Sequence, residues 1–324
     1  MSEPILRVED LHVWFDLPGG GTLHAVQGAS LALSTGERFG LVGESGCGKT
    51  TAILAMMGLL PPSATVDGHI VLEGDDILAG GEDSMRPHRW TDIAMVFQGA
   101  MNALNPVKTV GWQIVEAMEF HCTATGAEAE ERVGELLEMV GISPDRASRF
   151  PHEFSGGMRQ RAAIAMALAC NPKILLADEP TTALDVMVQA QILQLLVKLS
   201  NELGLTLVLV THDLPVVAEI CDRAAVMYAG EIVETASVDS LVHDARHPYS
   251  RLLFAAVPDP QGVEDIVSIP GTPPRLDRRQ VGCPFAPRCD RVFEPCREVR
   301  PVLQEVADDH QAACHLNDVE VFAP

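Results

Sequence analysis

Two stretches near the N-terminus, residues 5–15 and 22–33, alternate apolar with polar residues. Such alternation places successive side chains on opposite faces of a strand. Gly19, Gly20 and Gly21 lie between the two stretches, and glycine-rich turns commonly join neighbouring strands. The pattern therefore predicts a β-hairpin or a pair of antiparallel strands at the start of the chain.

Residues 38–43 predict a short strand that runs into a glycine-rich loop, and two further apolar runs are short and continuous, over residues 174–178 and 206–211. Runs of this kind are typical of strands buried on both faces of a parallel sheet. One helix is expected from about Lys49, and a longer one from Val186 to Leu203, which Gly204 follows. Together these elements predict an α/β fold.

The segment from about residue 100 to 160 differs, because its apolar residues follow helical spacing at Val133, Leu136, Leu137 and Val140. We expect a helical insertion there. After about residue 240 proline becomes frequent, which indicates a linker and a small appendage. The predicted organisation is a main domain over residues 1–240, with its insertion at about 100–160, and an extension over residues 241–324.

The composition narrows the classes of function. The formal net charge of −22 argues against non-specific binding to nucleic acid, so we expect no nucleic-acid partner. No stretch is long and apolar enough for a membrane-spanning helix, and the N-terminus lacks the features of a secretory signal. We expect the chain to stay in the cytosol unless a partner holds it elsewhere.

Residues 43–50 fit the phosphate-loop pattern G-x-x-x-x-G-K-[ST] at every fixed position, with a predicted strand before and a helix after them. The loop consists of Gly43, Glu44, Ser45, Gly46, Cys47, Gly48, Lys49 and Thr50. Its glycines allow backbone N–H groups to turn toward phosphates at a helix N-terminus. We expect Lys49 to bridge the β- and γ-phosphates and Thr50 to bind Mg²⁺.

Two carboxylates end the apolar strand over residues 174–178. Asp178 is placed to hold Mg²⁺, directly or through water, and Glu179 is the natural general base for an attacking water. Alone, adjacent acids at a strand end are often a solvated turn. With the phosphate loop they predict hydrolysis of a nucleoside triphosphate.

A second anion site is expected where Ser155 precedes Gly156 and Gly157 at the start of a helix. Ser155 occupies the N-cap position, and the two glycines leave backbone N–H groups uncovered. An ordinary capped helix would explain the serine but not both glycines.

The combination resembles the ATP-binding subunit of ABC transporters over nearly the whole chain. Residues 155–160 are similar to the family's signature motif, Gln98 to its Q-loop glutamine, Asp185 to its D-loop aspartate and His212 to its switch histidine. Phe15 resembles the aromatic residue that stacks on adenine, although a phenylalanine ending a strand is more often part of the core. The resemblance implies a P-loop NTPase (RecA-like) core with an antiparallel β subdomain, a helical insertion subdomain and a small C-terminal extension that contains cysteines.

The resemblance also implies a mechanism in which two subunits form a head-to-tail dimer around two ATP molecules. Catalytic roles then fall to Lys49, Gln98, Glu179 and His212. Mg²⁺ is held by Thr50, Gln98 and Asp178. The residues that contact nucleotide are Phe15, Gly43, Glu44, Ser45, Gly46, Cys47, Gly48, Lys49, Thr50, Thr51, Gln98, Ser155, Gly156, Gly157, Gln160, Asp178 and Asp185.

Several segments are similar to the D-type ATPase of the oligopeptide/dipeptide importer branch, including residues 177–185, 247–249 and 269–274. This implies an F-type ATPase partner, two membrane permeases and an extracytoplasmic binding protein. The chain would then be a peripheral protein on the cytoplasmic side of the inner membrane. Nickel and glutathione importers share the branch. Gly99 and Ala100 depart from it, which leaves the contact with the permease less defined.

Four cysteines near the C-terminus need a separate explanation. Cys283, Cys289, Cys296 and Cys314 could supply four thiolates for a [4Fe–4S] cluster or for zinc, but no tight C-x₂₋₄-C knuckle of structural zinc is present. Seven arginines against four acidic residues over residues 275–300 would offset the charge of a cluster. The importer branch carries this pattern, so the expectation is a [4Fe–4S] cluster, with zinc or no metal as alternatives.

Two other functions compete with an importer ATPase. A non-transport ABC ATPase of DNA repair or translation normally carries a coiled-coil insertion or two cassettes, and this chain shows neither pattern. An iron–sulfur redox enzyme would need a substrate or flavin signal, which the sequence lacks.

Overall fold

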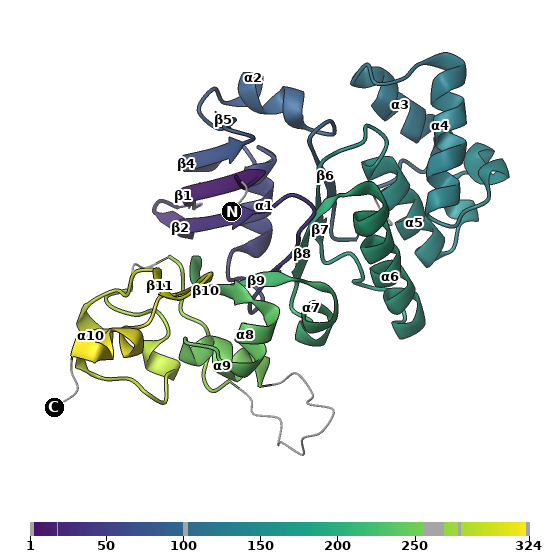
Figure 1. Cartoon of the computed structure of the whole chain (residues 1–324). Helices are drawn as coiled ribbons and strands as arrows, with labels where there is room; N and C mark the ends of the chain where they lie inside the picture. Colours follow the sequence, from purple (N-terminus) through teal and green to yellow (C-terminus); the bar gives the residue numbers. More distant parts are fainter. Residues whose placement is uncertain (1–2, 18, 100–102, 256–268, 278–279, 322–324) are drawn as a thin grey trace. The chain divides into compact units, whose positions relative to one another are not determined.

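The structure is a computed structural model that describes residues 3–17, 19–99, 103–255, 269–277 and 280–321 (Figure 1). The chain divides into two compact units. The first unit comprises residues 1–34, 38–82 and 210–324, and the second comprises residues 35–37 and 83–209. The predicted α/β class is confirmed, and each unit contains both strands and helices. The boundaries predicted at residues 100, 160 and 240 stay predictions.

An antiparallel sheet opens the first unit, in the strand order β2-β1-β4-β5 (Figure 1). Along β1 the side chains of Leu6, Val8, Leu11 and Val13 are buried, whereas most of the residues between them are more exposed. The predicted strand pair is therefore confirmed, with register shifts in the ladder. The strands are β1 (Leu6–Asp16), β2 (Thr22–Leu33), β4 (Ala64–Leu72) and β5 (Asp75–Asp76).

Five other strands of this unit follow one another in the order β11-β12-β10-β9-β3. β3 pairs with β9 in parallel, and the remaining ladders are antiparallel. The C-terminal extension thus adds two strands beside β10. These strands are β3 (Arg38–Val42), β9 (Arg223–Tyr228), β10 (Glu231–Ser237), β11 (Gln304–Ala307) and β12 (His310–Ala312).

The helices of the first unit are short. The helix expected from Lys49 is confirmed as α1, which ends well before Pro61. The bounds are α1 (Lys49–Met56), α7 (Leu214–Ile220), α8 (Val238–His243), α9 (Pro248–Phe254) and α10 (Glu294–Glu298), with 3-10 helices at Ala286–Arg288 and His315–Val321.

Three buried strands form the sheet of the second unit, in the order β8-β7-β6, and β6 and β7 are parallel. Every residue of β7 and β8 is buried, as the continuous apolar runs predicted. The strands are β6 (Ile93–Val96), β7 (Ile174–Asp178) and β8 (Thr206–Thr211), whose last two residues belong to the first unit.

The helices of the second unit include those of the predicted insertion. In α4 the predicted apolar face is buried, with Val133, Leu136 and Leu137 at 3% exposure or less. α6 ends where Gly204 adopts a left-handed conformation at φ 65°. The helices are α2 (Glu82–Met85), which starts at the unit boundary, α3 (Val110–Phe120), α4 (Gly126–Met139), α5 (Gly156–Ala167) and α6 (Val186–Leu203), with 3-10 helices at Arg86–His88, Pro144–Ser148 and Pro151–Glu153.

Within the described residues, no helix has the length and hydropathy that crossing a membrane requires.

Candidate functional site

The phosphate loop joins β3 to α1, and its backbone requires glycine at two positions. Gly43 has φ 149° and Gly48 has φ 111°, where other residues are strained. A Cβ atom would lie 2.1 Å from the carbonyl oxygen of Met227 at position 43 and 2.6 Å from that of Ala25 at position 48. No side chain caps the N-terminus of α1. The loop is therefore a glycine-dependent turn with first-turn N–H groups suited to an anion.

Lys49 is folded onto the loop that it belongs to. Its side chain is buried, and Nζ donates hydrogen bonds to the carbonyl oxygens of Gly43 at 2.7 Å and Glu44 at 3.0 Å. These carbonyls hold the ammonium group at the mouth of the loop. Phosphate oxygens are stronger partners for this cation than carbonyl oxygens, because they carry full negative charge.

Cys47 is the loop residue most open to oxidation by its chemistry, yet its thiol is protected. The residue is 6% exposed, and burial raises its pKa despite the opposing charge of Lys49. A thiol that stays protonated reacts slowly, since the thiolate is the nucleophile.

In the second unit, Glu179 follows β7 and its carboxylate is oriented by two donors. Gln98 Nε2 donates to Glu179 Oε2 at 2.7 Å, and the hydroxyl of Thr182 donates to the same oxygen at 2.9 Å. Glu179 also has φ 42°, an uncommon value for a residue that is not glycine. The preceding Asp178 is buried. The structure thus brings together two predicted residues, Gln98 and Glu179, and adds Thr182, a contact that the sequence analysis missed.

The predicted anion site at residues 155–157 is a helix start in the second unit. Ser155 caps α5, because its hydroxyl accepts a hydrogen bond from the N–H of Met158 at 3.3 Å. At Gly157 an added Cβ would lie 2.6 Å from Cγ1 of Val188 in α6. Asp185 in turn caps α6 by accepting from the N–H of Val188 at 3.0 Å. The start of α5 and the start of α6 therefore meet at one packing contact, between Gly157 and Val188.

The remaining predicted residues belong to several elements. Phe15 is the second-last residue of β1 and is half-buried, Thr50 and Thr51 lie in α1, and Gln160 is buried in α5. His212 follows β8, is exposed and belongs to the first unit. Their roles in nucleotide binding stay predictions.

The expected iron–sulfur cluster is wrong. Cys283, Cys289, Cys296 and Cys314 line one small cavity of about 10 Å³, which is at the lower limit for a single water. Burial raises the pKa of Cys283 to about 11 and that of Cys314 to about 12, so these thiols stay protonated. Within the part of the chain that the structure describes, no group of three or more His, Cys, Asp or Glu side chains is positioned to hold a metal ion. The same finding gives no support to the zinc alternative among the described residues.

The arginines of the extension were expected to offset the charge of a cluster, and the structure gives them other partners. Arg288 binds Glu44 of the phosphate loop, Arg300 pairs with Glu231 at 2.5 Å, and Arg275 pairs with Asp277. Arg278 and Arg279 lie outside the described residues. Three of the seven arginines therefore make ion pairs with acidic side chains.

The sequence analysis also missed two residues that touch the phosphate loop, Arg288 and Tyr249. The hydroxyl of Tyr249 accepts a hydrogen bond from the N–H of Glu44 at 3.0 Å. Tyr249 had been noted only as part of a segment typical of the importer branch. The sequence offered one indication of such a contact, because Glu44 is the only acidic residue of its loop and a carboxylate there suits a cationic partner.

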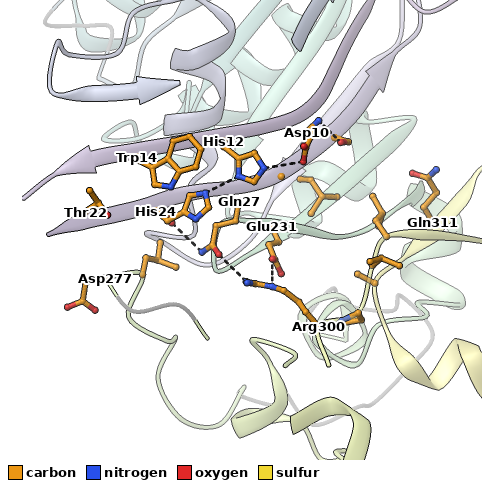
Figure 2. Close-up of a pocket in the computed structure, with 18 residues that line it drawn as sticks. Asp10, His12, Trp14, Thr22, His24, Gln27, Glu231, Asp277, Arg300 and Gln311 are labelled. Atoms are coloured by element: carbon orange, nitrogen blue, oxygen red, sulfur yellow. Dashed lines mark hydrogen bonds and ion pairs between the residues drawn. The ribbon is translucent and has the colours of Figure 1, made fainter. Parts of the chain in front are cut away.

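A large cavity of about 920 Å³ lies on another part of the first unit (Figure 2). Figure 2 shows the rings of His12, Trp14 and His24 gathered along β1 and β2, with Arg300 reaching Gln27 and Glu231. Neither Phe15 nor any residue of the phosphate loop lines this cavity. This cavity is therefore distinct from the predicted nucleotide site, although its volume is large.

Comparison with known proteins identifies the family. A model described as ABC transporter matches residues 26–182, and one described as oligopeptide/dipeptide transporter, C-terminal region, matches residues 233–296. The probable peptide ABC transporter ATP-binding protein y4tR of Sinorhizobium fredii is 48% identical over 319 residues, 97% of this chain and 95% of that protein. The chain belongs to the ABC transporter family.

Other ABC proteins agree with this assignment. The dipeptide transport ATP-binding protein DppD of Bacillus subtilis is 46% identical over 323 residues, 98% of this chain and 96% of DppD. The dimeric post-hydrolysis structure of the ATP-binding cassette MJ0796, bound to ADP and Pi, has a TM-score of 0.64 and 30% identity, and covers 72% of this chain and 98% of that chain. The predicted ABC ATPase is confirmed.

Proposed function

We propose that this chain hydrolyses ATP to power a membrane importer for peptides. The observation that carries the ATP-binding part is the phosphate loop, in which two glycines exclude a Cβ atom and Lys49 is held at the loop mouth. The peptide cargo rests on the printed names of similar proteins, which are peptide and dipeptide transport ATP-binding proteins.

In this proposal each predicted residue has one task. Lys49 binds the β- and γ-phosphates, and Phe15 stacks on the adenine. Mg²⁺ would be held by the Thr50 hydroxyl, the Asp178 carboxylate and the side-chain oxygen of Gln98, since Mg²⁺ prefers oxygen ligands. Once bound, the ion would neutralise charge on the phosphates.

Glu179 is proposed as the general base that accepts a proton from the attacking water. One of its oxygens already accepts from Gln98 and Thr182, which fixes the orientation of the carboxylate. A base that is oriented before reaction loses less entropy in the transition state. His212 would hold the γ-phosphate.

The proposal includes a head-to-tail dimer in which Ser155 and Gly157 of one protomer face the ATP of the other. The solved cassette MJ0796 is described as dimeric, which supports this arrangement. We further propose an F-type ATPase as the second subunit, two permeases, an extracytoplasmic binding protein, and a peripheral position on the cytoplasmic side of the inner membrane.

The test is reconstitution of the chain with its F-type ATPase partner, the two permeases and the binding protein in vesicles. ATP-driven uptake of labelled di- and oligopeptides is expected, with no uptake of Ni²⁺ or glutathione. Uptake of Ni²⁺ or glutathione instead of peptides would reassign the cargo. A complex that takes up none of these with ATP present would contradict the proposal.

A further inference from the structure

Glu44 is the only acidic residue of the phosphate loop, and an arginine of the C-terminal extension holds it. Arg288 Nη1 donates to Glu44 Oε2 at 2.6 Å, and Arg288 Nη2 donates to Oε1 at 2.9 Å. This two-point pairing fixes the direction of the carboxylate as well as its position. Glu44 and Arg288 are 244 residues apart in the sequence.

The guanidinium group of Arg288 is itself fixed and buried. Its Nε donates to the carbonyl oxygen of Pro270 at 2.7 Å, and Nη1 also donates to the hydroxyl of Tyr228 at 3.2 Å. The Arg288 side chain is only 4% exposed. The Glu44 carboxylate raises its pKa, so the group stays charged. The Glu44 side chain is 27% exposed, so the pair is part-buried, and removing Arg288 leaves the carboxylate without its partner charge.

The backbone of Glu44 is held at both of its polar groups. The N–H donates to the Tyr249 hydroxyl at 3.0 Å, and the carbonyl accepts from Lys49 at 3.0 Å. Burial raises the pKa of Tyr249, whose ring packs against Tyr228 and Phe285 with centroids 4.6 and 5.4 Å away. Two of the groups that fix Glu44 therefore lie C-terminal to residue 240.

We propose that Arg288 is a positioning residue for nucleotide binding, through which the C-terminal extension sets the affinity of the phosphate loop for ATP. It acts by fixing Glu44 and by cancelling its charge next to the phosphate site. This inference rests on the proposed function, because it requires that the loop binds a nucleoside triphosphate. Without Arg288, a bare carboxylate in the loop repels the ligand, and the repulsion grows with the number of phosphates.

The experiment measures dissociation constants of the full chain for MgATP, MgADP and adenosine by calorimetry at low salt. In Arg288→Met we expect binding of MgATP to weaken about tenfold, that of MgADP to weaken less, and that of adenosine to stay unchanged. In the double variant Arg288→Met/Glu44→Gln the uncompensated charge is gone, so MgATP affinity should return to that of Glu44→Gln. Arg288→Lys should lie between wild type and Arg288→Met, because lysine lacks the two-point geometry.

Arg275 offers a matched control in the same extension. It also makes a two-point contact with a carboxylate, from Nε and Nη2 to Asp277 at 3.2 and 2.6 Å, but its side chain is 79% exposed. Arg275→Met should leave all three dissociation constants unchanged, because exposed pairs contribute little.

Several outcomes separate the two proposals. If wild type binds MgATP, Lys49→Met abolishes that binding and Arg288→Met equals wild type, the inference is wrong while the proposed function stands. If Arg288→Met weakens all three ligands equally and Glu44→Gln does not rescue it, Arg288 is merely structural. A wild-type chain that does not bind MgATP contradicts the proposed function itself. Should Arg288→Met fail to fold, the double variant and Arg288→Lys carry the same comparison.

Discussion

Two glycine-rich helix starts among the described residues, at α1 and α5, are built in opposite ways. In the phosphate loop no side chain caps α1, and Lys49 lies across the loop carbonyls. In the signature segment Ser155 caps α5 through its hydroxyl. The first-turn N–H groups of α1 thus have no side-chain cap and are suited to bind an anion. At the start of α5, one such N–H group is already hydrogen-bonded to the serine.

The glycines of the two segments are needed for different reasons. At Gly43 an added Cβ would meet backbone, the carbonyl oxygen of Met227. At Gly157 it would meet the side chain of Val188. A side chain can be shortened by mutation but a backbone cannot, so the two sites should respond differently to the same substitution.

The largest expected effect is that of Lys49→Met on the phosphate loop. Loss of the buried cation should weaken MgATP binding at least about a hundredfold, since charge-assisted contacts to phosphate are the strong ones. Calorimetry on the full chain measures this. Lys198 is the matched control, since it is 56% exposed and 3.8 Å from Glu202, and Lys198→Met should bind like wild type. Equal MgATP affinities in Lys49→Met and wild type would contradict the assignment of the phosphate loop as the helix start that binds the anion.

Gly43→Ala and Gly157→Ala test the backbone against the side-chain explanation. Both variants should lose stability, and overpacking at Gly157 should cost about 1–3 kcal/mol. Adding Val188→Ala to Gly157→Ala should recover most of the lost stability. No side-chain truncation should recover the stability of Gly43→Ala. Chemical denaturation gives the free energies of unfolding. Failure of Val188→Ala to rescue Gly157→Ala would show that the two glycines are not distinguished in this way.

His247 connects pH to the region that supports the phosphate loop. It caps α9 by accepting from the N–H of Tyr249 at 3.0 Å, and burial lowers its pKa to about 4. The unfolded chain takes up this proton near its ordinary pKa of 6.5, so stability is lost as the pH falls from about 6.5 toward 4. The loss attributable to His247 should approach roughly 3 kcal/mol.

The variant His247→Asn isolates this effect, because asparagine is a good N-cap and does not titrate. Unfolding free energies measured from pH 7 to 4 should fall more steeply in wild type than in the variant. Parallel pH profiles would contradict the assignment to His247.

The smallest effect is expected at Cys47. Because its thiol is buried with a raised pKa, peroxide should inactivate wild type and Cys47→Ser at the same rate, each relative to its untreated activity. ATPase assays after timed exposure to peroxide check this. Faster inactivation of wild type would mean that the loop opens enough to expose the thiol.

Local patterns were sufficient to predict much of the fold. Alternation predicted the pairing of β1 with β2, continuous apolar runs predicted β7 and β8, and glycine marked the end of α6. The cap at Ser155 also followed from residue type and position. In each case the deciding interaction lies within a few residues or within one periodic segment.

Long-range contacts could not be predicted in this way. The pairing of Arg288 with Glu44 depends on how the extension packs in the first unit, and no local pattern encodes it. The four C-terminal cysteines show the opposite kind of error, in which a sequence pattern predicts a site that the structure does not form. Their number would be enough for a metal site, and they are Cys283, Cys289, Cys296 and Cys314. The cavity that they line is only about 10 Å³, and among the described residues no group of three or more such side chains is positioned for a metal ion.

The most direct test of the proposed mechanism is single-turnover hydrolysis of ATP by Glu179→Gln in the reconstituted complex. Gln98 and Thr182 already orient this side chain, and glutamine keeps its shape while removing the base. We predict that ATP binding is retained and that the hydrolysis rate falls at least about a hundredfold. A hydrolysis rate equal to that of wild type would contradict the assignment of Glu179 as the general base.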